Sequence, residues 1–212
     1  MSDLDSTIEL LRGRRGGDMP PETAEFVVTY TRMLALGKPV SAQSLANELG
    51  DPVEFMVTAL HQMQQTGAEL NDEGELIGAA LTLTPTSHHF RVDGVQLYAW
   101  CALDTMFLPA YIGKTAQVSS TCPITQKPIS MTITPDGVEN ISPKETVLSI
   151  MTATGCSAGI AGTFCSQVNF FASSEAAQKW IGERSDFSIL SVSDSYQLAQ
   201  AIYIEPVLKY FN

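Results

Sequence analysis

The sequence is poor in positive charge. It has 12 lysines and arginines against 23 aspartates and glutamates in 212 residues, which gives a net charge of −11 at pH 7. A field of that sign repels the phosphates of nucleic acids and the anionic surface of a membrane. We therefore expect no nucleic acid and no membrane among the partners of this protein, whereas a small-molecule substrate remains open.

The sequence also lacks segments that would carry it into or across a membrane. No apolar run approaches the ~18 to 20 residues that span a bilayer, and the opening stretch MSDLDSTIELLRGRRGGD has no apolar core of the kind that a secretory signal needs. The four cysteines are too sparse for a secreted disulfide scaffold. We therefore expect a globular, cytoplasmic protein whose thiols are reduced.

Closely spaced cysteine pairs are missing as well. The cysteines stand at positions 101, 122, 156 and 165, and the chain contains no Cys-x-x-Cys. Structural zinc sites use two such pairs of ligands, and thioredoxin-like redox sites use one. The spacing therefore argues against both a closed zinc site and a dithiol redox centre.

Residues 1–80 predict a winged helix-turn-helix-like module. Helical patterns cover 22–36, 44–49 and 52–65, and a two-stranded hairpin follows around a turn at 71–74. The segment 52–65 would be the recognition helix, but it carries no lysine or arginine, the residues that contact phosphates. A packing role or a lid is therefore favoured over DNA binding.

Residues 81–212 alternate strand and turn signals, which predict an α+β domain with a mixed or antiparallel β-sheet and flanking helices. Asp93-Gly94 is a hairpin turn signal, and a Gly-rich loop covers 154–162. The expected strands lie at 81–83, 89–92, 95–98, 116–120, 129–134, 147–151 and 188–192, and the expected helices at 99–108 with an interruption at Pro109, from Ser173/Ser174 to 181, and after a cap at Asp194.

The stretch from Tyr98 to Asp104 places a thiol and a carboxyl three residues apart among apolar residues. On a helix these positions share a face, so Cys101 and Asp104 would address one small volume. We expect a helix to begin at Cys101 and its N-terminus to lower the pKa of the thiol. Apolar surroundings should raise the pKa of Asp104, so that it holds and delivers a proton. The alternative for Cys101 is a buried structural thiol.

The other cysteines have different surroundings. Cys165 lies in an aromatic-rich stretch that begins at Phe164 and is predicted as a strand, whose phenylalanines either pack the core or enclose an apolar substrate. Cys122 belongs to a Cys-Pro turn and is expected to be structural. Cys156, in the Gly-rich loop, is either an accessory thiol or incidental.

Two motifs resemble those of the alkylmercury lyases, also called organomercurial lyases. The first is YAWCALDT at 98–105, and the second is Phe164-Cys165 followed by VNFFAS at 168–173. The resemblance covers about 81–180. It extends to the N-terminal module, which is winged-helix-like in that family.

The resemblance implies an enzyme of mercury detoxification. Such an enzyme cleaves the carbon–mercury bond of alkyl- and arylmercury compounds by protonolysis, giving a hydrocarbon and Hg²⁺. The two catalytic cysteines of the family fall on Cys101 and Cys165, and its catalytic aspartate falls on Asp104; all three would also contact the Hg²⁺ product. Thiolates are the preferred ligands of a soft metal such as mercury. Trp100 and Phe164 are hypothesised to hold the organic group and exclude water.

The resemblance further implies that no cofactor is needed and that Hg²⁺ leaves to small-molecule thiols or to mercuric reductase. Some members of the family carry a second cysteine after the Phe-Cys pair, where this chain has Ser166, so the route of release stays open. The alternative function is a non-catalytic, thiol-based binding protein or sensor for mercury or another soft metal.

Overall fold

The structure is a computed structural model that describes residues 3–15, 19–152 and 164–211. The Gly-rich loop predicted at 154–162, with Cys156, lies outside the described residues. Helices and antiparallel sheets combine in the rest of the chain, so the α+β class is confirmed.

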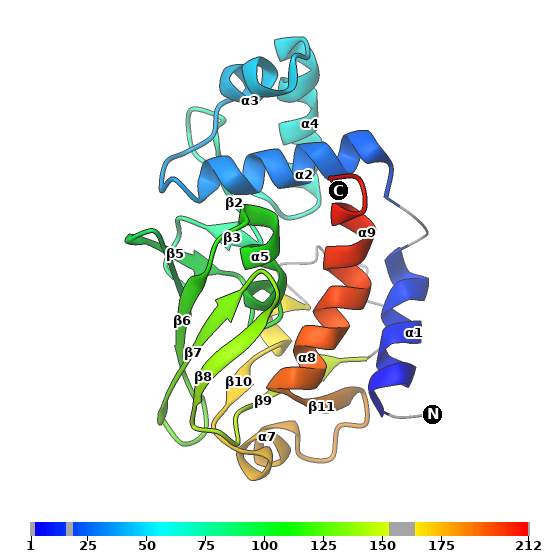
Figure 1. Cartoon of the computed structure of the whole chain (residues 1–212), viewed down its shortest axis with the longest axis vertical. Helices are drawn as coiled ribbons and strands as arrows, with labels where there is room; N and C mark the ends of the chain where they lie inside the picture. The colour runs from blue at the N-terminus through cyan, green and yellow to red at the C-terminus, as the bar shows by residue number, and fades with distance from the viewer. Residues whose placement is uncertain (1–2, 16–18, 153–163, 212) are drawn as a thin grey trace.

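Helices form the N-terminal part of the chain, as the apolar periodicity predicts. The helix α3 begins where the Ser41 hydroxyl accepts the N–H of Ser44, and it ends at Gly50, whose φ of 75° is left-handed. In Figure 1 α3 and α4 form a lobe at one end of the molecule, beyond α2. The helices are α1 (Asp3–Arg15), α2 (Pro21–Leu34), α3 (Ala42–Leu49) and α4 (Val53–Gln65).

An antiparallel sheet of eight strands forms the body of the molecule, in the order β1-β2-β3-β5-β4-β6-β7-β8. The hairpin predicted at Asp93-Gly94 joins β4 to β5, with Val92 opposite Val95. The strands are β1 (Glu69–Leu70), β2 (Leu76–Ala79), β3 (Leu81–Thr82), β4 (His88–Val92), β5 (Val95–Ala99), β6 (Ala116–Thr121), β7 (Pro128–Thr134) and β8 (Gly137–Ser142).

The sheet is continuous across the domain boundary expected after residue 80. β2 pairs with β3 around Ala80, which has a left-handed φ of 66°. The wing strands β1 and β2 therefore belong to the same sheet as the strands that follow them. The division into residues 1–80 and 81–212 stays a prediction.

A second sheet of three antiparallel strands, in the order β10-β9-β11, adjoins a set of C-terminal helices. Ser173 caps the helix that follows β10, as predicted. The expected cap at Asp194 is wrong, because the Ser191 hydroxyl accepts the N–H of Asp194 and so caps α8. The elements are β9 (Val147–Met151), η1 (Cys165–Gln167), β10 (Phe170–Phe171), α7 (Ser174–Ile181), β11 (Phe187–Ser191), α8 (Val192–Ala199), η2 (Gln200–Ile204) and α9 (Glu205–Leu208).

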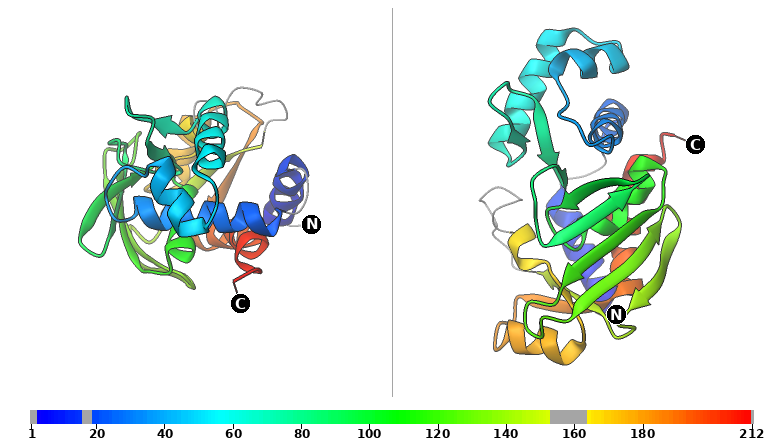
Figure 2. Two further views of the ribbon diagram at one scale, coloured as in Figure 1. Left: turned by 90° about the horizontal axis from the view of Figure 1, so that it is seen from above. Right: turned by 90° about the vertical axis from the view of Figure 1, so that its left-hand side faces the viewer.

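The helix α5 (Asp104–Ile112) is the central helix, and all nine of its residues are buried. It packs against β7, α2 and α8, and Figure 2 shows α1 and α8 behind the large sheet. The interruption predicted at Pro109 is wrong. The proline removes one backbone hydrogen bond, but packing on all sides of α5 holds the helix together, and it ends at Gly113 with a φ of 75°.

None of the helices within the described ranges combines the length and the apolar character needed to cross a bilayer.

Gly37 tests how tightly the end of α2 packs on the β4–β5 hairpin. A Cβ at Gly37, where φ is +76°, would meet Val95 Cγ1 at 2.7 Å, whereas a Cβ at Gly74, with a φ of +77°, meets nothing within 4 Å. We expect Gly74→Ala to cost about 1 kcal/mol of unfolding free energy through the left-handed backbone alone. Gly37→Ala should cost roughly 1 to 3 kcal/mol more, because the added methyl group would overpack the site and the stiff side chain of Val95 cannot easily move aside. Urea denaturation measures both, and equal losses would contradict the close contact.

Candidate active site

A turn, rather than a helix, carries Cys101. The helix predicted over 99–108 begins only at Asp104, because β5 continues to Ala99 and the next N–H groups have non-helical partners. The N–H of Cys101 donates to Asp104 Oδ2 at 2.9 Å, and that of Ala102 donates to the carbonyl of Val168 at 3.1 Å. Cys101 and Asp104 therefore meet across a tight turn and not on one face of a helix.

Cys165 lies on a 3₁₀ turn, so the strand predicted there is wrong. The N–H of Val168 closes this turn on the carbonyl of Cys165 at 3.2 Å, which leaves those groups unavailable to a strand ladder. The buried Ser149 of β9 ties the turn down, because its hydroxyl donates to Gln167 O at 2.8 Å and accepts the N–H of Asn169 at 3.1 Å. Strand structure in this stretch is limited to the two residues of β10.

The two turns bring together the three groups predicted to carry the chemistry. The sulfurs of Cys101 and Cys165 and a carboxylate oxygen of Asp104 all lie within 4.8 Å of one another. Cys165 Sγ is 4.0 Å from Asp104 Oδ2, and both cysteines are free thiols. Cys101 is 0% exposed, Cys165 is 4% exposed and Asp104 is 8% exposed. The cluster is therefore secluded from bulk water.

Burial dominates the electrostatics of this cluster. It raises the pKa of Asp104 from 3.8 to about 7, although hydrogen bonds from the side chain and backbone of Cys101 pull the other way. Burial also raises the pKa of the Cys101 thiol well above its ordinary value, helped by a hydrogen bond with Cys165 and by the charges of Asp104 and Cys165. The predicted lowering of the Cys101 pKa is therefore wrong: the helix starts three residues later, and desolvation of the thiolate outweighs any dipole.

The arrangement suits one soft metal ion held between two sulfurs with a proton beside it. Two metal–thiolate bonds of ~2.3 Å span roughly 4.6 Å when they are collinear, a figure taken from zinc. A carboxyl whose pKa is about 7 exchanges its proton readily near neutral pH. Within the described ranges this is the cluster of three His, Cys, Asp or Glu ligands that is close enough to hold a metal.

An aromatic residue directly precedes each of the two cysteines of the cluster in sequence. Trp100 and Phe164 are both half-buried. The indole Nε1–H of Trp100 donates to Glu69 Oε1 at 2.8 Å, across 31 residues of sequence. No local pattern in the sequence points to Glu69; only the pairing of β1, β2, β3 and β5 brings the wing beside the residue before Cys101.

Cys122 stands apart from the cluster, in the turn after β6. Its N–H donates to Lys127 O at 3.0 Å, and its carbonyl accepts the N–H of Gln126 at 2.9 Å. Burial raises the pKa of its thiol, but hydrogen bonds from the Thr125 hydroxyl and nearby backbone N–H groups lower it by more. The pKa of Cys122 therefore lies below its ordinary value. The structural role expected for Cys122 stays a prediction.

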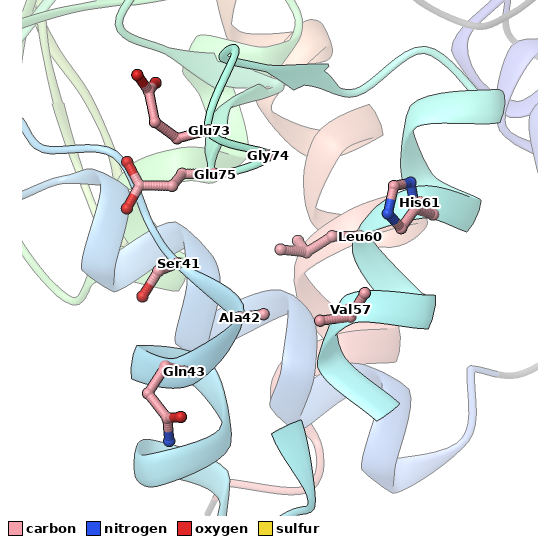
Figure 3. Close-up of a pocket in the computed structure, with 9 residues that line it drawn as sticks. All are labelled: Ser41, Ala42, Gln43, Val57, Leu60, His61, Glu73, Gly74 and Glu75. Carbon is pink, nitrogen blue, oxygen red and sulfur yellow. The ribbon is translucent and has the colours of Figure 1, made fainter. Parts of the chain in front are cut away.

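A pocket of about 300 Å³ lies in the N-terminal part of the chain, between residues 41 and 75 in sequence. Figure 3 shows Val57, Leu60 and His61 projecting from α4, with Glu73 and Glu75 near the wing turn. Its lining combines apolar, polar and acidic side chains but includes no cysteine, so it lacks the sulfur ligands of the cluster described above.

Comparisons with known proteins single out one family. The family model of alkylmercury lyases, MerB, matches residues 81–204. The alkylmercury lyase of Staphylococcus epidermidis is 42% identical over 169 residues, which cover 80% of this chain and 77% of that protein. The alkylmercury lyase of Pseudomonas putida is 38% identical over 202 residues, 94% of each chain. A crystal structure of the mercury-bound form of MerB2 shares the fold, with a TM-score of 0.76 at 23% identity, and covers 98% of this chain and 100% of that one.

Burial of Asp104 should make the stability of the protein depend on pH. The pKa of Asp104 in the folded protein, about 7, exceeds the ordinary value of 3.8. The contribution of Asp104 to folding stability is therefore fully present at pH values below that ordinary pKa and is lost as pH rises through 7. Asp104→Asn should therefore be more stable than the wild type at about pH 8, by at most about 4 kcal/mol, and equally stable near pH 4. Thermal unfolding at both pH values measures this, with the exposed Asp72→Asn as control. An effect of equal size at both pH values would contradict the raised pKa.

Proposed function

This chain belongs to the alkylmercury lyase family and acts as an organomercurial lyase, and we propose that Cys101, Asp104 and Cys165 carry out its reaction. The reaction is protonolysis of the carbon–mercury bond of an alkyl- or arylmercury compound, for mercury detoxification. The observation that supports this assignment is the buried cluster of two sulfurs and one carboxylate oxygen within 4.8 Å of one another.

The first steps transfer the organomercurial to the two sulfurs. The substrate arrives as R–Hg–SR′ with a small thiol, and one cysteine displaces that thiol, which leaves as R′SH with the cysteine's proton. As the second cysteine bonds to mercury, its proton moves to the Asp104 carboxylate. The 4.0 Å separation of Cys165 Sγ from Asp104 Oδ2 supports that transfer. Two thiolates then donate electron density through mercury toward the carbon.

The last step breaks the carbon–mercury bond. Asp104 gives the proton it has received to the carbon, the electron pair of the carbon–mercury bond forms the new carbon–hydrogen bond, and the hydrocarbon leaves. Hg²⁺ remains bound to two thiolates beside the Asp104 carboxylate. A pKa of about 7 suits this role, because the carboxylate both accepts and releases a proton near neutral pH.

Trp100 and Phe164 enclose the organic group in this mechanism. Each directly precedes a sulfur ligand, and both are half-buried rather than packed away in the core. Their rings would exclude water from the reacting carbon, which strengthens the electrostatic contribution of Asp104.

The reaction needs no cofactor, because mercury is the substrate and the protein supplies both thiolates and the proton shuttle. Hg²⁺ then leaves by thiol exchange to small-molecule thiols or to mercuric reductase. Ser166 stands next to Cys165 where some relatives have a second cysteine, so the final exchange relies on the incoming thiol. This chemistry requires reduced cysteines, which supports a cytoplasmic location.

The N-terminal part is a winged-helix-like domain of residues 1–80 in this proposal, ahead of a catalytic domain of residues 81–212. The order of α2, α3, α4 and the β1–β2 hairpin supports that description. The helix α4 carries no lysine or arginine, so the domain serves the enzyme rather than nucleic acid. The net charge of −11 gives no support to a membrane partner either.

Hydrocarbon release tests the assignment directly. We expect the protein with excess small thiol to release benzene from phenylmercury, measured in the headspace against a thiol-only control. Cys101→Ser and Cys165→Ser should each lose activity by on the order of a thousandfold or more, because a hydroxyl is a poor ligand for a soft metal. Ser166→Ala, the exposed neighbour on the same 3₁₀ turn, is the matched control and should retain activity.

The same assay separates the alternative function. A mercury-binding protein or sensor would take up Hg²⁺ at the two cysteines but release no benzene above the control. That result would sink the lyase mechanism and leave only thiol-based binding.

The proton shuttle predicts a pH profile. Because ionised Asp104 must accept the thiol proton, kcat/KM should rise by roughly tenfold per pH unit at low pH and level off above about 7, the pKa of Asp104. Asp104→Asn should bind Hg²⁺ normally yet lose most turnover along with this limb of the profile. An Asn variant with a near-normal rate would remove Asp104 from the role of shuttle.

A further inference from the structure

Glu69, on the wing strand β1 of the large sheet, is the acceptor of three side-chain hydrogen bonds. Its Oε2 accepts from the hydroxyls of Thr82 at 2.7 Å and Thr84 at 2.8 Å. Its Oε1 accepts the indole Nε1–H of Trp100 at 2.8 Å. Thr82 is fully buried and its hydroxyl also accepts the N–H of Thr84 at 3.0 Å. The Glu69 carboxylate is therefore fixed from two directions.

Gly78 leaves the space that this carboxylate occupies. A Cβ at Gly78 would lie 2.5 Å from Glu69 Oε2 and 2.6 Å from Thr82 Oγ1, distances that real Cβ atoms do not adopt. The carboxylate lies directly against the backbone of β2, so any larger residue at position 78 would displace it. The wing thus contributes an acceptor and the room for it.

Trp100 is held at both its backbone and its side chain. Its N–H donates to Ala80 O at 2.9 Å, and Ala80 keeps a left-handed φ of 66°, a conformation that few non-glycine residues adopt. Its indole is bonded to Glu69. The two residues that hold Trp100 come from β1 and from the β2–β3 turn. They fix Trp100 immediately before the turn that carries Cys101.

We propose that Glu69 is a positioning residue for the reaction. Its hydrogen bond orients the indole of Trp100, the residue before Cys101. The inference rests on the proposed function, because it matters only if Trp100 bounds the organomercurial. It also gives the N-terminal part of the chain a role in catalysis, since the carboxylate comes from the wing and the indole from the residue before Cys101.

The role of Glu69 is orientation, and that predicts which quantities move. Glu69 acts on the cluster through one residue, the hydrogen-bonded Trp100. Loss of the Glu69 carboxylate therefore leaves both thiols and Asp104 in place and Hg²⁺ uptake intact. A displaced Trp100 indole instead leaves the organic group of the substrate poorly positioned in the transition state. Displacements of about 1 Å can cost on the order of a hundredfold in rate.

The test is a double-mutant cycle between Glu69 and Trp100 on the full chain, with phenylmercury as substrate. Glu69→Ala should lower kcat/KM by roughly tenfold to a hundredfold without changing the Hg²⁺ stoichiometry. Glu69→Gln should recover activity to within about threefold, because the amide oxygen still accepts from the indole. In a Trp100→Phe background, Glu69→Ala should have less than about a twofold further effect. The exposed Glu73→Ala, on the same wing, removes the same charge and should behave as the wild type.

A spectroscopic measurement addresses the hydrogen bond itself. The chain has two tryptophans, so Trp180→Phe makes Trp100 the sole emitter. Glu69→Ala should then shift the Trp100 emission, whereas Glu73→Ala should not. Replacing Trp100 in that background by benzothienylalanine, which lacks the N–H, should lower kcat/KM even though Glu69 is untouched, which covers the case in which Glu69→Ala fails to fold.

The outcomes are separable. If the wild type releases no benzene, the proposed lyase mechanism fails, and an unshifted Trp100 emission would overturn the Glu69–Trp100 contact independently. If the wild type is active but Glu69→Ala retains full kcat/KM, or loses as much in the Trp100→Phe background as in the parent, Glu69 has no positioning role.

Discussion

The burial of an ionisable carboxyl against two thiols is the constraint on which the rest of this structure depends. A carboxylate removed from water must be neutralised or hydrogen-bonded, and the N–H of Cys101 meets only part of that need for Asp104. The remaining cost appears as a pKa raised to about 7. That cost gives the proposed mechanism its proton shuttle, because a solvated aspartate would be too weak a base to accept a thiol proton.

Keeping these groups together requires that two distant turns be fixed against each other. Neither turn belongs to a regular element: Cys101 stands between β5 and α5, and Cys165 stands on a 3₁₀ turn ahead of β10. A backbone hydrogen bond from Ala102 N–H to Val168 O joins them, and the Ser149 hydroxyl secures the second turn to β9. The buried helix α5 then supplies the rigid support from which Asp104 projects. Irregular backbone carries the reactive groups, and regular elements hold it in place.

The wing extends the same arrangement toward the N-terminal part of the chain. β1 and β2 continue the large sheet, and the carboxylate of Glu69 reaches the indole of Trp100. The N-terminal strands are thus structural partners of the segment that carries Cys101, although the helices α3 and α4 form a lobe at one end of the molecule (Figure 1).

The sequence by itself determined the α+β class, most helix and strand positions, and the candidate residues Cys101, Asp104 and Cys165, because apolar periodicity, turn residues and short motifs are local signals. It failed where local preference met tertiary partners. The turn at Cys101 was predicted as helix, since nothing local shows that Asp104 will accept the Cys101 N–H and that Val168 will accept the N–H of Ala102. The pKa of Cys101 was predicted in the wrong direction for the same reason. Desolvation depends on everything that packs around a group, and only the tertiary structure decides that; the contact of Glu69 with Trp100 likewise arises only when four strands pair.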